Sequence, residues 1–445
     1  MPFHRRLACK LNYFQSIILM FAAVILIGAA LLMLPISAQE RTVTPFHEAL
    51  FTATSAVCVT GLVVRDTASH WSAFGQAVLM VLIQIGGLGV ITVGASFSLL
   101  SGRRISLSQR GRMQEAMSAP KVGGIVRLTG FVIRTSLMIE GIGALCMLPV
   151  FCRDFGVSGI WKAVFHSVSA FCNAGFDLMG TPDMPFVSLI AYRADPVISL
   201  TISALIVVGG IGFLTWDDVR CNRLCFHRYR LQSKVILTST ALLILLPALY
   251  FFCFEFKGST LRERLLLSLF QSVTPRTAGF NTADYTSLSS SGRGLTILLM
   301  FIGGSPGSTA GGIKTTTAAV LVANAFAVFR RQKSPEMFGR RMEEKAVHDA
   351  AAIFTLYLVL SLTGAFVIST VEMLPLSECL FETTSAIATV GLSLGLTPHL
   401  GIVSQGILIF LMFIGRVGGL TMIYAALSGS KSSAARLPQE RITVG

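Results

Sequence analysis

The chain has 445 residues, of which 53% are hydrophobic and only 13% carry a charge. Soluble chains carry about a quarter charged residues, so the composition excludes an ordinary soluble protein and predicts an all-α integral membrane protein. The net charge is +14. Because basic residues keep loops on the cytoplasmic side of a membrane, we attribute this charge to topology rather than to a nucleic-acid partner.

The first long apolar segment extends from about Phe14 to Ile36 and follows three basic residues. A signal peptide has an apolar core of roughly 7–15 residues, so this longer run is predicted to be a retained spanning helix. Basic residues cluster in the N-terminal arm, in three loops and in the tail. The clusters are Arg5 to Lys10, Arg103 to Arg127, Arg220 to Lys234, Arg330 to Lys345 and Lys431 to Arg441. Both termini are therefore predicted to be cytoplasmic, with two spans in each interval.

A shorter, semi-polar stretch lies between the two long apolar segments of each interval. Each stretch contains a short apolar-periodic helix, a Ser/Thr-rich turn, and a glycine followed by Leu or Phe. The stretches are FHEALFTATSAVCVTGL (46–62), WKAVFHSVSAFCNAGF (161–176), RLLLSLFQSVTPRTAGF (264–280) and SECLFETTSAIATVGL (377–392). A helix of about ten residues rises about 15 Å, half of the hydrocarbon core. Such helices are predicted to enter the membrane and return, which buried or cavity-lining backbone allows.

The stretches recur at about a quarter of the chain length, which predicts four tandem repeats around one central pore. The predicted repeats are 1–110, 111–230, 231–345 and 346–445. Each repeat is expected to contain a helix, a re-entrant pore helix, a filter turn and a second helix that carries a glycine motif. The prediction therefore comprises eight spanning helices and four re-entrant pore helices.

The four turns have the chemistry of a cation filter. Rings of backbone carbonyls replace the water around a dehydrated potassium ion, and glycine supplies the positive φ values that such turns require. The negative ends of the short helices also face the ion path. The predicted carbonyl ligands are Val59, Thr60, Gly61, Asn173, Ala174, Gly175, Thr277, Ala278, Gly279, Thr389, Val390 and Gly391.

The last segment of the third repeat, residues 294–329, departs from the pattern. As one helix it would be about 54 Å long, and its middle is too rich in Gly, Ser and Pro to remain helical. We predict a gating loop at 303–317, below the filter; a fixed helix kink is the alternative. The predicted gate residues in this loop are Gly303, Gly304, Ser305, Pro306, Gly307, Ser308, Thr309, Ala310, Gly311, Gly312 and Lys314. Because Ile313 separates Gly312 from Lys314, the loop does not fit a nucleotide-binding P-loop.

Arg416 is predicted to be part of the gate and replaces the second glycine of the motif in the other repeats. An intramembrane charge is costly and faces a cavity or a partner. Arg416 is expected to place a barrier on the ion path, to pair with Glu140 or loop carbonyls, or to do both. Glu48 and Glu382, at similar depths in two pore helices, are expected to fix those helices by hydrogen bonds rather than to attract cations. His166 is expected to be a packing residue.

These residues resemble the Trk/Ktr/HKT superfamily of potassium transporters, most closely the KtrB-type membrane subunits of bacterial Ktr systems. The resemblance covers nearly the whole chain. It rests on the turns CVTGL, CNAGF, RTAGF and ATVGL, the loop GGSPGSTAGGIKTTT and the arginine of IGRVGG. It implies potassium uptake through a multi-pass protein of the bacterial cell (inner) membrane. In HKT relatives a serine at the first filter position accompanies sodium preference, so Gly61 favours potassium.

The resemblance further implies a homodimer on a cytosolic ring of KtrA-like RCK-domain subunits, with uptake that is often stimulated by sodium. A nucleotide is expected only on that partner, and K⁺ as cargo and Na⁺ as activator are the ions expected here. An alternating-access cation symporter is the alternative function, although four repeats of one topology favour a pore. The seven dispersed histidines form no catalytic cluster in the sequence, so no enzyme activity is predicted.

Overall fold

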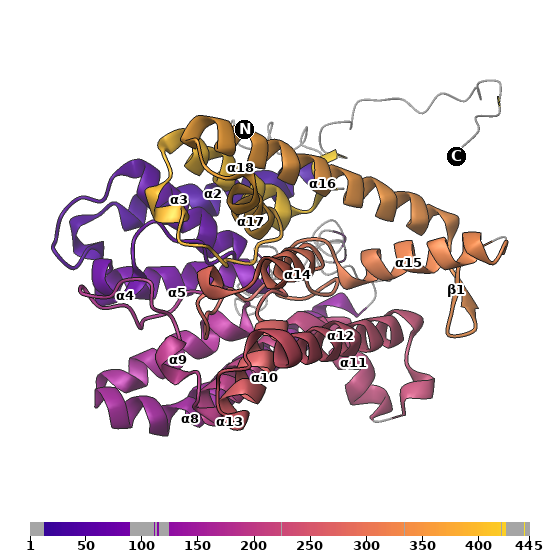
Figure 1. Cartoon of the computed structure of the whole chain (residues 1–445), viewed down its shortest axis with the longest axis horizontal. Helices are drawn as coiled ribbons and strands as arrows, with labels where there is room; N and C mark the ends of the chain where they lie inside the picture. Colours follow the sequence, from indigo (N-terminus) through magenta and orange to yellow (C-terminus); the bar gives the residue numbers. More distant parts are fainter. Residues whose placement is uncertain are drawn as a thin grey trace, which may run out of the picture.

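A computed structural model of the chain describes residues 13–89, 124–223, 225–332, 334–419 and 421–423, together with 111, 114 and 440. The described part is mostly helical, with irregular segments between the helices (Figure 1). The basic clusters predicted at both termini, and most of the cluster at 103–127, lie outside these residues, and so do most of the residues at the boundary between the first two predicted repeats. The cytoplasmic placement of the termini therefore stays a prediction.

A long helix, a short helix, a largely irregular segment and a further helix follow one another four times along the described chain. The first set is α2 (Tyr13–Leu32), η1 (Pro35–Ser37), α3 (Phe46–Cys58), α4 (Thr67–His70) and α5 (Ala73–Leu88). The second is α8 (Ile125–Phe155), α9 (Ser158–Phe171), η2 (Ile190–Tyr192), α10 (Pro196–Ile211), α11 (Phe213–Asn222) and η3 (Phe226–Arg228).

The third and fourth sets are joined by a small β-hairpin. The third set is α12 (Leu231–Tyr250), the π-helical turn η4 (Phe251–Glu255), α13 (Leu261–Val273), η5 (Tyr285–Ser287), α14 (Ser290–Phe301) and α15 (Thr315–Phe329). The hairpin pairs β1 (Glu336–Met337) with β2 (Arg340–Arg341). The fourth set is α16 (Glu344–Glu372), α17 (Leu376–Ile387), η6 (Thr397–His399) and α18 (Ile402–Val417).

Four described helices are long and apolar enough to cross a membrane, namely Phe14–Leu32, Ile125–Phe155, Leu231–Glu255 and Glu344–Glu372. The pair α10 and α11 adds a fifth if it is one span, but it bends by 94°. Three of the second helices stop at a glycine with positive φ: α5 at Gly89, α10 at Gly212 and α18 at Gly418. The predicted eight spanning helices stay a prediction, because residues 90–110 and most of those after Gly419 lie outside the described part.

Apolar side chains cover the outer surface of the long helices. Examples of exposed leucines are Leu26 on α2, Leu145 on α8 and Leu245 on α12. An exposed apolar surface of this extent is unfavourable in water but suits the lipid phase. These helices and their surfaces are those of a multi-pass membrane protein.

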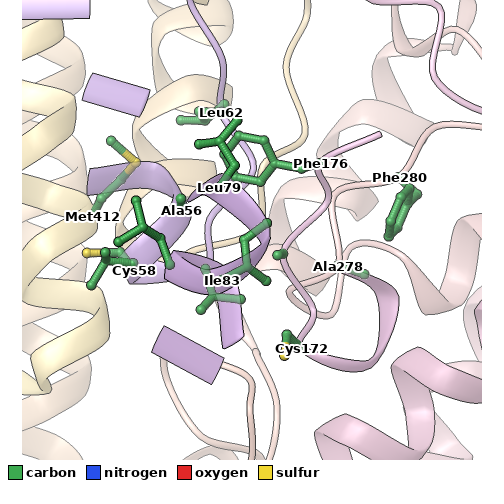
Figure 2. Close-up of a cluster of buried hydrophobic side chains, with 14 of the residues drawn as sticks. Ala56, Cys58, Leu62, Leu79, Ile83, Cys172, Phe176, Ala278, Phe280 and Met412 are labelled. Atoms are coloured by element: carbon green, nitrogen blue, oxygen red, sulfur yellow. The ribbon is translucent and has the colours of Figure 1, made fainter. Parts of the chain in front are cut away.

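The short helices lie at the centre of the structure, where packing between consecutive sets forms a closed cycle. The second helix of each set packs against the short helix of the next: α5 on α9, α10 on α13, α14 on α17 and α18 on α3. Figure 2 shows one part of this core, where residues of α3 and α5 lie between Met412 of α18 and the turns that carry Phe176 and Ala278. The last set therefore packs against the first.

Glycine permits the close approach of helix backbones at this centre. A methyl group on the first glycine of three second-helix motifs would lie closer than 3.0 Å to a backbone carbonyl in the last turn of the short helix of its own set. The pairs are Gly86 with Val57, Gly209 with Phe171 and Gly415 with Ile387. The glycine motifs seen in the sequence thus support the ends of the short helices.

Candidate functional site

The four glycine turns share one backbone conformation. The residue two places before each glycine has a positive φ, which is uncommon for a residue other than glycine and costly for a β-branched one. The φ angles are 57° at Val59, 59° at Asn173, 76° at Thr277 and 52° at Thr389. The glycines follow with φ of 92° at Gly61, 70° at Gly175, 81° at Gly279 and 89° at Gly391. The same strain in four turns indicates that the conformation itself is required.

The turns also meet one another in a closed ring. Each glycine faces the carbonyl oxygen of the residue before the glycine in the next turn, and a methyl group there would lie closer than 3.0 Å to that oxygen. The pairs are Gly61 with Ala174, Gly175 with Ala278, Gly279 with Val390 and Gly391 with Thr60. Eight of the twelve predicted ligand residues are thus brought together, namely the glycine of each turn and the residue before it, and no side chain fits at the glycine positions.

Ser and Thr residues of the short helices hold the turns in place. The N–H groups of Gly61 and Gly391 donate to the hydroxyls of Ser55 and Ser385, both at 3.0 Å. In the other two turns the hydroxyl donates instead, from Ser169 to the carbonyl of Phe176 and from Thr274 to that of Phe280, both at 2.7 Å. These bonds engage the glycine N–H in two turns and the carbonyl of the following Phe in the other two, and so hold the backbone of all four turns in place.

A cavity of about 310 Å³ opens above the ring. All four turn glycines line it, together with the acidic side chains of Asp66, Asp177 and Asp284. Burial raises the pKa of the Asp177 carboxyl to about 6, and the charge of Asp66 adds to the rise, whereas the N–H of Met179 opposes it. The cavity is therefore a polar vestibule that is negatively charged at neutral pH.

Glu48 and Glu382 both act as fixing residues, as expected, but in different ways. Glu48 accepts two hydrogen bonds of 2.9 Å from Arg65. Glu382 is fully buried and accepts from Ser393, Leu394 and Thr397, which lie just after the fourth turn. Their positions are not equivalent, because Glu48 lies one helical turn farther from its glycine than Glu382 does.

His166 holds the segment after the second turn. Its Nε2 accepts from the N–H of Leu178 at 3.3 Å, and its ring packs against Phe151 and Phe280. Its Nδ1 also bonds the carbonyl of Lys162 at 2.7 Å. His166 is thus the packing residue that the sequence suggested, with two hydrogen bonds added.

The predicted gating loop is irregular and lies directly under the turns. The helix breaks after Phe301 and restarts at Thr315, as the composition predicted. Glycines 311 and 312 leave no space for a methyl group against Thr389 and Ala388 at the fourth turn. Thr309 is fully buried and its hydroxyl donates to the carbonyl of Phe171 at 3.0 Å. The loop therefore contacts the bases of two turns and fills the space between them.

Arg416 fastens this loop to the first set of helices. Its guanidinium donates to the carbonyl of Thr309 in the loop and to those of Gly86 and Gly87 at the end of α5. Lys314, also in the loop, donates to the carbonyl of Ala310 at 2.6 Å. Of the partners suggested by the sequence, the loop carbonyls are present. Glu140 is not a partner of Arg416.

Glu140 belongs to a separate buried network that sequence reasoning missed. Its carboxylate accepts from the Gln84 amide at 2.9 Å, and the Gln84 oxygen accepts from the Cys172 thiol at 3.6 Å. Cys172 directly precedes the second turn. An acidic residue inside a long apolar helix was the signal for this network, but only the fold shows its partner.

Arg276 was also missed, although it stands within the third turn motif, RTAGF. The side chain is buried, it donates one 3.3 Å hydrogen bond to the Thr240 hydroxyl, and its Nε has no partner among the described residues. The other three turns have Cys58, Cys172 and Ala388 at this position. A charge at one of four equivalent positions was the available signal.

A family model described as "Cation transport protein", TrkH, matches residues 10–434. The chain belongs to the TrkH family of cation transport proteins. Members of this family that resemble it closely include the potassium/sodium uptake protein NtpJ of Enterococcus hirae, at 40% identity over 99% of both chains. The Ktr system potassium uptake protein B of Bacillus subtilis is also 40% identical, over 97% of this chain and 96% of the relative.

The TrkH-family fold is shared with a solved structure. The potassium transporter TrkH from Vibrio parahaemolyticus superposes with a TM-score of 0.74 over 92% of this chain and 83% of its own, at 17% sequence identity. At that identity the comparison establishes the fold. Together with the apolar surfaces of the long helices, family membership identifies a multi-pass membrane transporter.

Proposed function

We propose that this chain forms a potassium-conducting pore and is the membrane subunit of a potassium uptake system. The observation that carries the proposal is the ring of four glycine turns, in which four equivalent strained backbones meet around one axis. Backbone carbonyls arranged in this way can replace the hydration shell of potassium. The hydroxyls of Thr60 and Thr389, both in the ring, have no hydrogen-bond partner among the described residues, which leaves them available to an ion or its water.

The proposal includes the finer architecture predicted from the sequence. Each of the four sets then supplies one spanning helix, one re-entrant pore helix, one filter turn and one second helix, with repeats at 1–110, 111–230, 231–345 and 346–445. The cyclic packing of α5, α10, α14 and α18 on the next short helix supports a central axis. The names of the relatives from Enterococcus hirae and Bacillus subtilis support potassium as the cargo.

The gate is assigned to the loop at 303–317 and to Arg416, below the filter. The buried loop occupies the space under the second and fourth turns, and Arg416 ties it to α5. An ion leaving the filter must displace this loop. The arrangement supports a closed state in which the arginine acts both as a latch and as a positive barrier.

Regulation is proposed to come from a cytosolic RCK-type subunit beneath a homodimer, with sodium as a stimulating ion. The relatives named for a Ktr system support a multi-subunit assembly. An alternating-access cation symporter is the second candidate. A flux above about 10⁴ ions per second would argue against it, because domain rocking takes microseconds to milliseconds.

Replacing Gly61 with Ser tests the filter. Its side chain would meet the carbonyl of Ala174, so we expect the potassium-over-sodium preference to fall by about tenfold, as for the loss of about 1.4 kcal/mol of selective binding. The measurement is competitive uptake of the two ions by cells that lack other potassium systems, with and without a co-expressed RCK subunit, across sodium concentrations.

Gly124→Ser is the matched control for this substitution. Gly124 has a similar φ of 81°, and nothing lies within 4 Å of a methyl group there. It therefore carries the same backbone strain without the ring contact. An unchanged ion preference in Gly61→Ser, with normal protein levels in the membrane, would contradict the filter assignment.

A further inference from the structure

Helix α11 contacts both the gating loop and the end of α9, which leads into the second turn. It leaves α10 at an angle of 94°. The N–H of Phe213, its first residue, donates to the carbonyl of Gly307 in the loop at 2.8 Å. The Trp216 indole donates to the carbonyl of Val208 at 3.1 Å, and its ring lies 5.8 Å from that of Phe171, the last residue of the second short helix. The first half of α11 is thus fixed to both parts of the proposed pore.

The bend itself is in backbone contact with the loop. Gly212, between α10 and α11, has a φ of 99°, and a methyl group there would lie 2.7 Å from the carbonyl oxygen of Pro306. Only glycine fits this contact and this angle. The start of α11 and residues 306–307 therefore cannot move independently.

The second half of α11 is held by one buried carboxylate. Asp218 is 3% exposed and accepts from the Ser233 hydroxyl at 2.5 Å and from the Arg230 N–H at 3.2 Å. It also pairs with the Arg230 guanidinium at 3.3 Å. Both donors lie at the start of α12, where the chain enters the third set. Hydrogen bonds to a buried charged group are strong, and their loss leaves the donors unpaired.

We infer that Asp218 is a positioning residue for the gate. It fixes α11 to the start of α12, and α11 holds the backbone of residues 306–307 under the filter. The inference rests on the proposed role of the loop as the gate. It adds a route by which the cytoplasmic connection between the second and third sets controls that loop.

The test uses the full chain in liposomes and measures potassium influx without any regulatory subunit. Asp218→Asn keeps the volume and removes the charge, so α11 loosens and influx rises about five- to tenfold, as expected for the loss of one charge-assisted hydrogen bond. Asp217→Asn is the matched control. Asp217 is the neighbouring acid, is partly exposed and makes a 3.5 Å pair with Arg230 and a weak 3.9 Å contact with the Cys221 thiol of its own helix, so influx stays at the wild-type level.

A deletion of residues 305–311 separates this inference from the gate proposal. If the deletion alone leaves influx low, the gate proposal fails. If the deletion raises influx but Asp218→Asn does not, the gate stands and the role of Asp218 is refuted.

Combining the two changes tests whether Asp218 acts through the loop. Asp218→Asn should not raise influx further in the deletion variant, because the loop that Asp218 positions is absent. A further rise of the same size in the double variant would show a general structural effect and overturn the inference.

Ser233→Ala covers the case in which Asp218→Asn fails to fold. It removes one of the donors to Asp218 and keeps the charge. It should raise influx in the same direction by a smaller factor, and again only when the loop is present. Wild-type influx in this variant would count against the inference.

Discussion

Asp177 is expected to make potassium uptake depend on the pH of the solution that fills the vestibule. It follows the second turn directly and lines the vestibule beside Asp66. Burial raises the pKa of its carboxyl to about 6, so the side chain is charged at pH 7 and neutral at pH 5. Since a negative vestibule concentrates cations, protonation lowers the local potassium concentration at the mouth of the filter.

We therefore expect the potassium concentration for half-maximal uptake to rise as the external pH falls from 7 to 5. Asp177→Asn should show the weaker uptake already at pH 7 and little further change. A carboxyl with a raised pKa in the folded state takes up protons before the unfolded chain does, so this group adds stability as the pH falls below about 6. Loss of uptake at pH 5 would thus not reflect unfolding at this site. An identical pH profile in the variant would contradict the prediction.

Arg276 places a second positive charge beside the filter. Its single hydrogen bond and unpaired Nε do not compensate the cost of burying a charge. At about 10 Å and an effective dielectric constant near 20, one charge repels a cation by about 1.7 kcal/mol. If the third turn binds potassium as proposed, Arg276 weakens that binding.

Arg276→Gln should tighten potassium binding by about two- to tenfold and raise the melting temperature. Equilibrium binding to the detergent-solubilised protein and thermal unfolding measure the two effects. Arg293→Gln is the control, because Arg293 also has an unpaired Nε among the described residues but lies on α14, outside the turn motif. Unchanged affinity in Arg276→Gln would leave only a structural role.

Among the structural elements, the gating loop contacts the second and fourth sets of helices directly, and Arg416 links it to the first. Arg416 supplies the contact from α18 to the loop and to α5. The planar guanidinium reaches carbonyls in different elements at once, whereas an ammonium group is a point charge. A substitution at Arg416 can therefore separate the latch from the barrier.

Arg416→Ala removes both the hydrogen bonds to the loop and the positive charge, and should speed potassium flux into reconstituted liposomes. Arg416→Lys keeps the charge and loses the simultaneous bonds. If the latch dominates, the lysine variant conducts nearly as fast as the alanine variant; if the barrier dominates, it stays close to wild type. A slower alanine variant would refute both roles and indicate that Arg416 only supports the fold.

Local patterns predicted the elements well and their partners poorly. The apolar periodicity before each glycine identified the short helices α3, α9, α13 and α17, and the Gly/Ser/Pro composition identified the break after Phe301. Both features depend only on residues that lie close together along the chain. The pairings of Glu140 with Gln84 and of Arg276 with Thr240 could not be predicted, because they join helices that are distant in sequence. Asp218 contacts the start of the following helix, but the turn between them hides which residues meet.

For the molecule as a whole, the sequence predicted an all-α membrane protein of the transporter superfamily. The family match and the shared fold confirm this family and this fold class. Where the second helix of each set ends was harder to predict. A glycine within an apolar run permits a helix or ends it. Gly89, Gly212 and Gly418 end α5, α10 and α18 in the structure, each with a positive φ that a right-handed helix does not allow.

The contact of Gly391 with the carbonyl of Thr60 also has a consequence for the order in which the protein assembles during synthesis. It joins the last turn to the first, so the ring is complete only after nearly the whole chain has entered the membrane. Until then, the first three turns hold polar carbonyls at membrane depth without their final neighbours, which is unfavourable, and such late, long-range contacts slow assembly. We therefore expect a chain that is truncated before the fourth turn to be degraded and not to form a smaller channel.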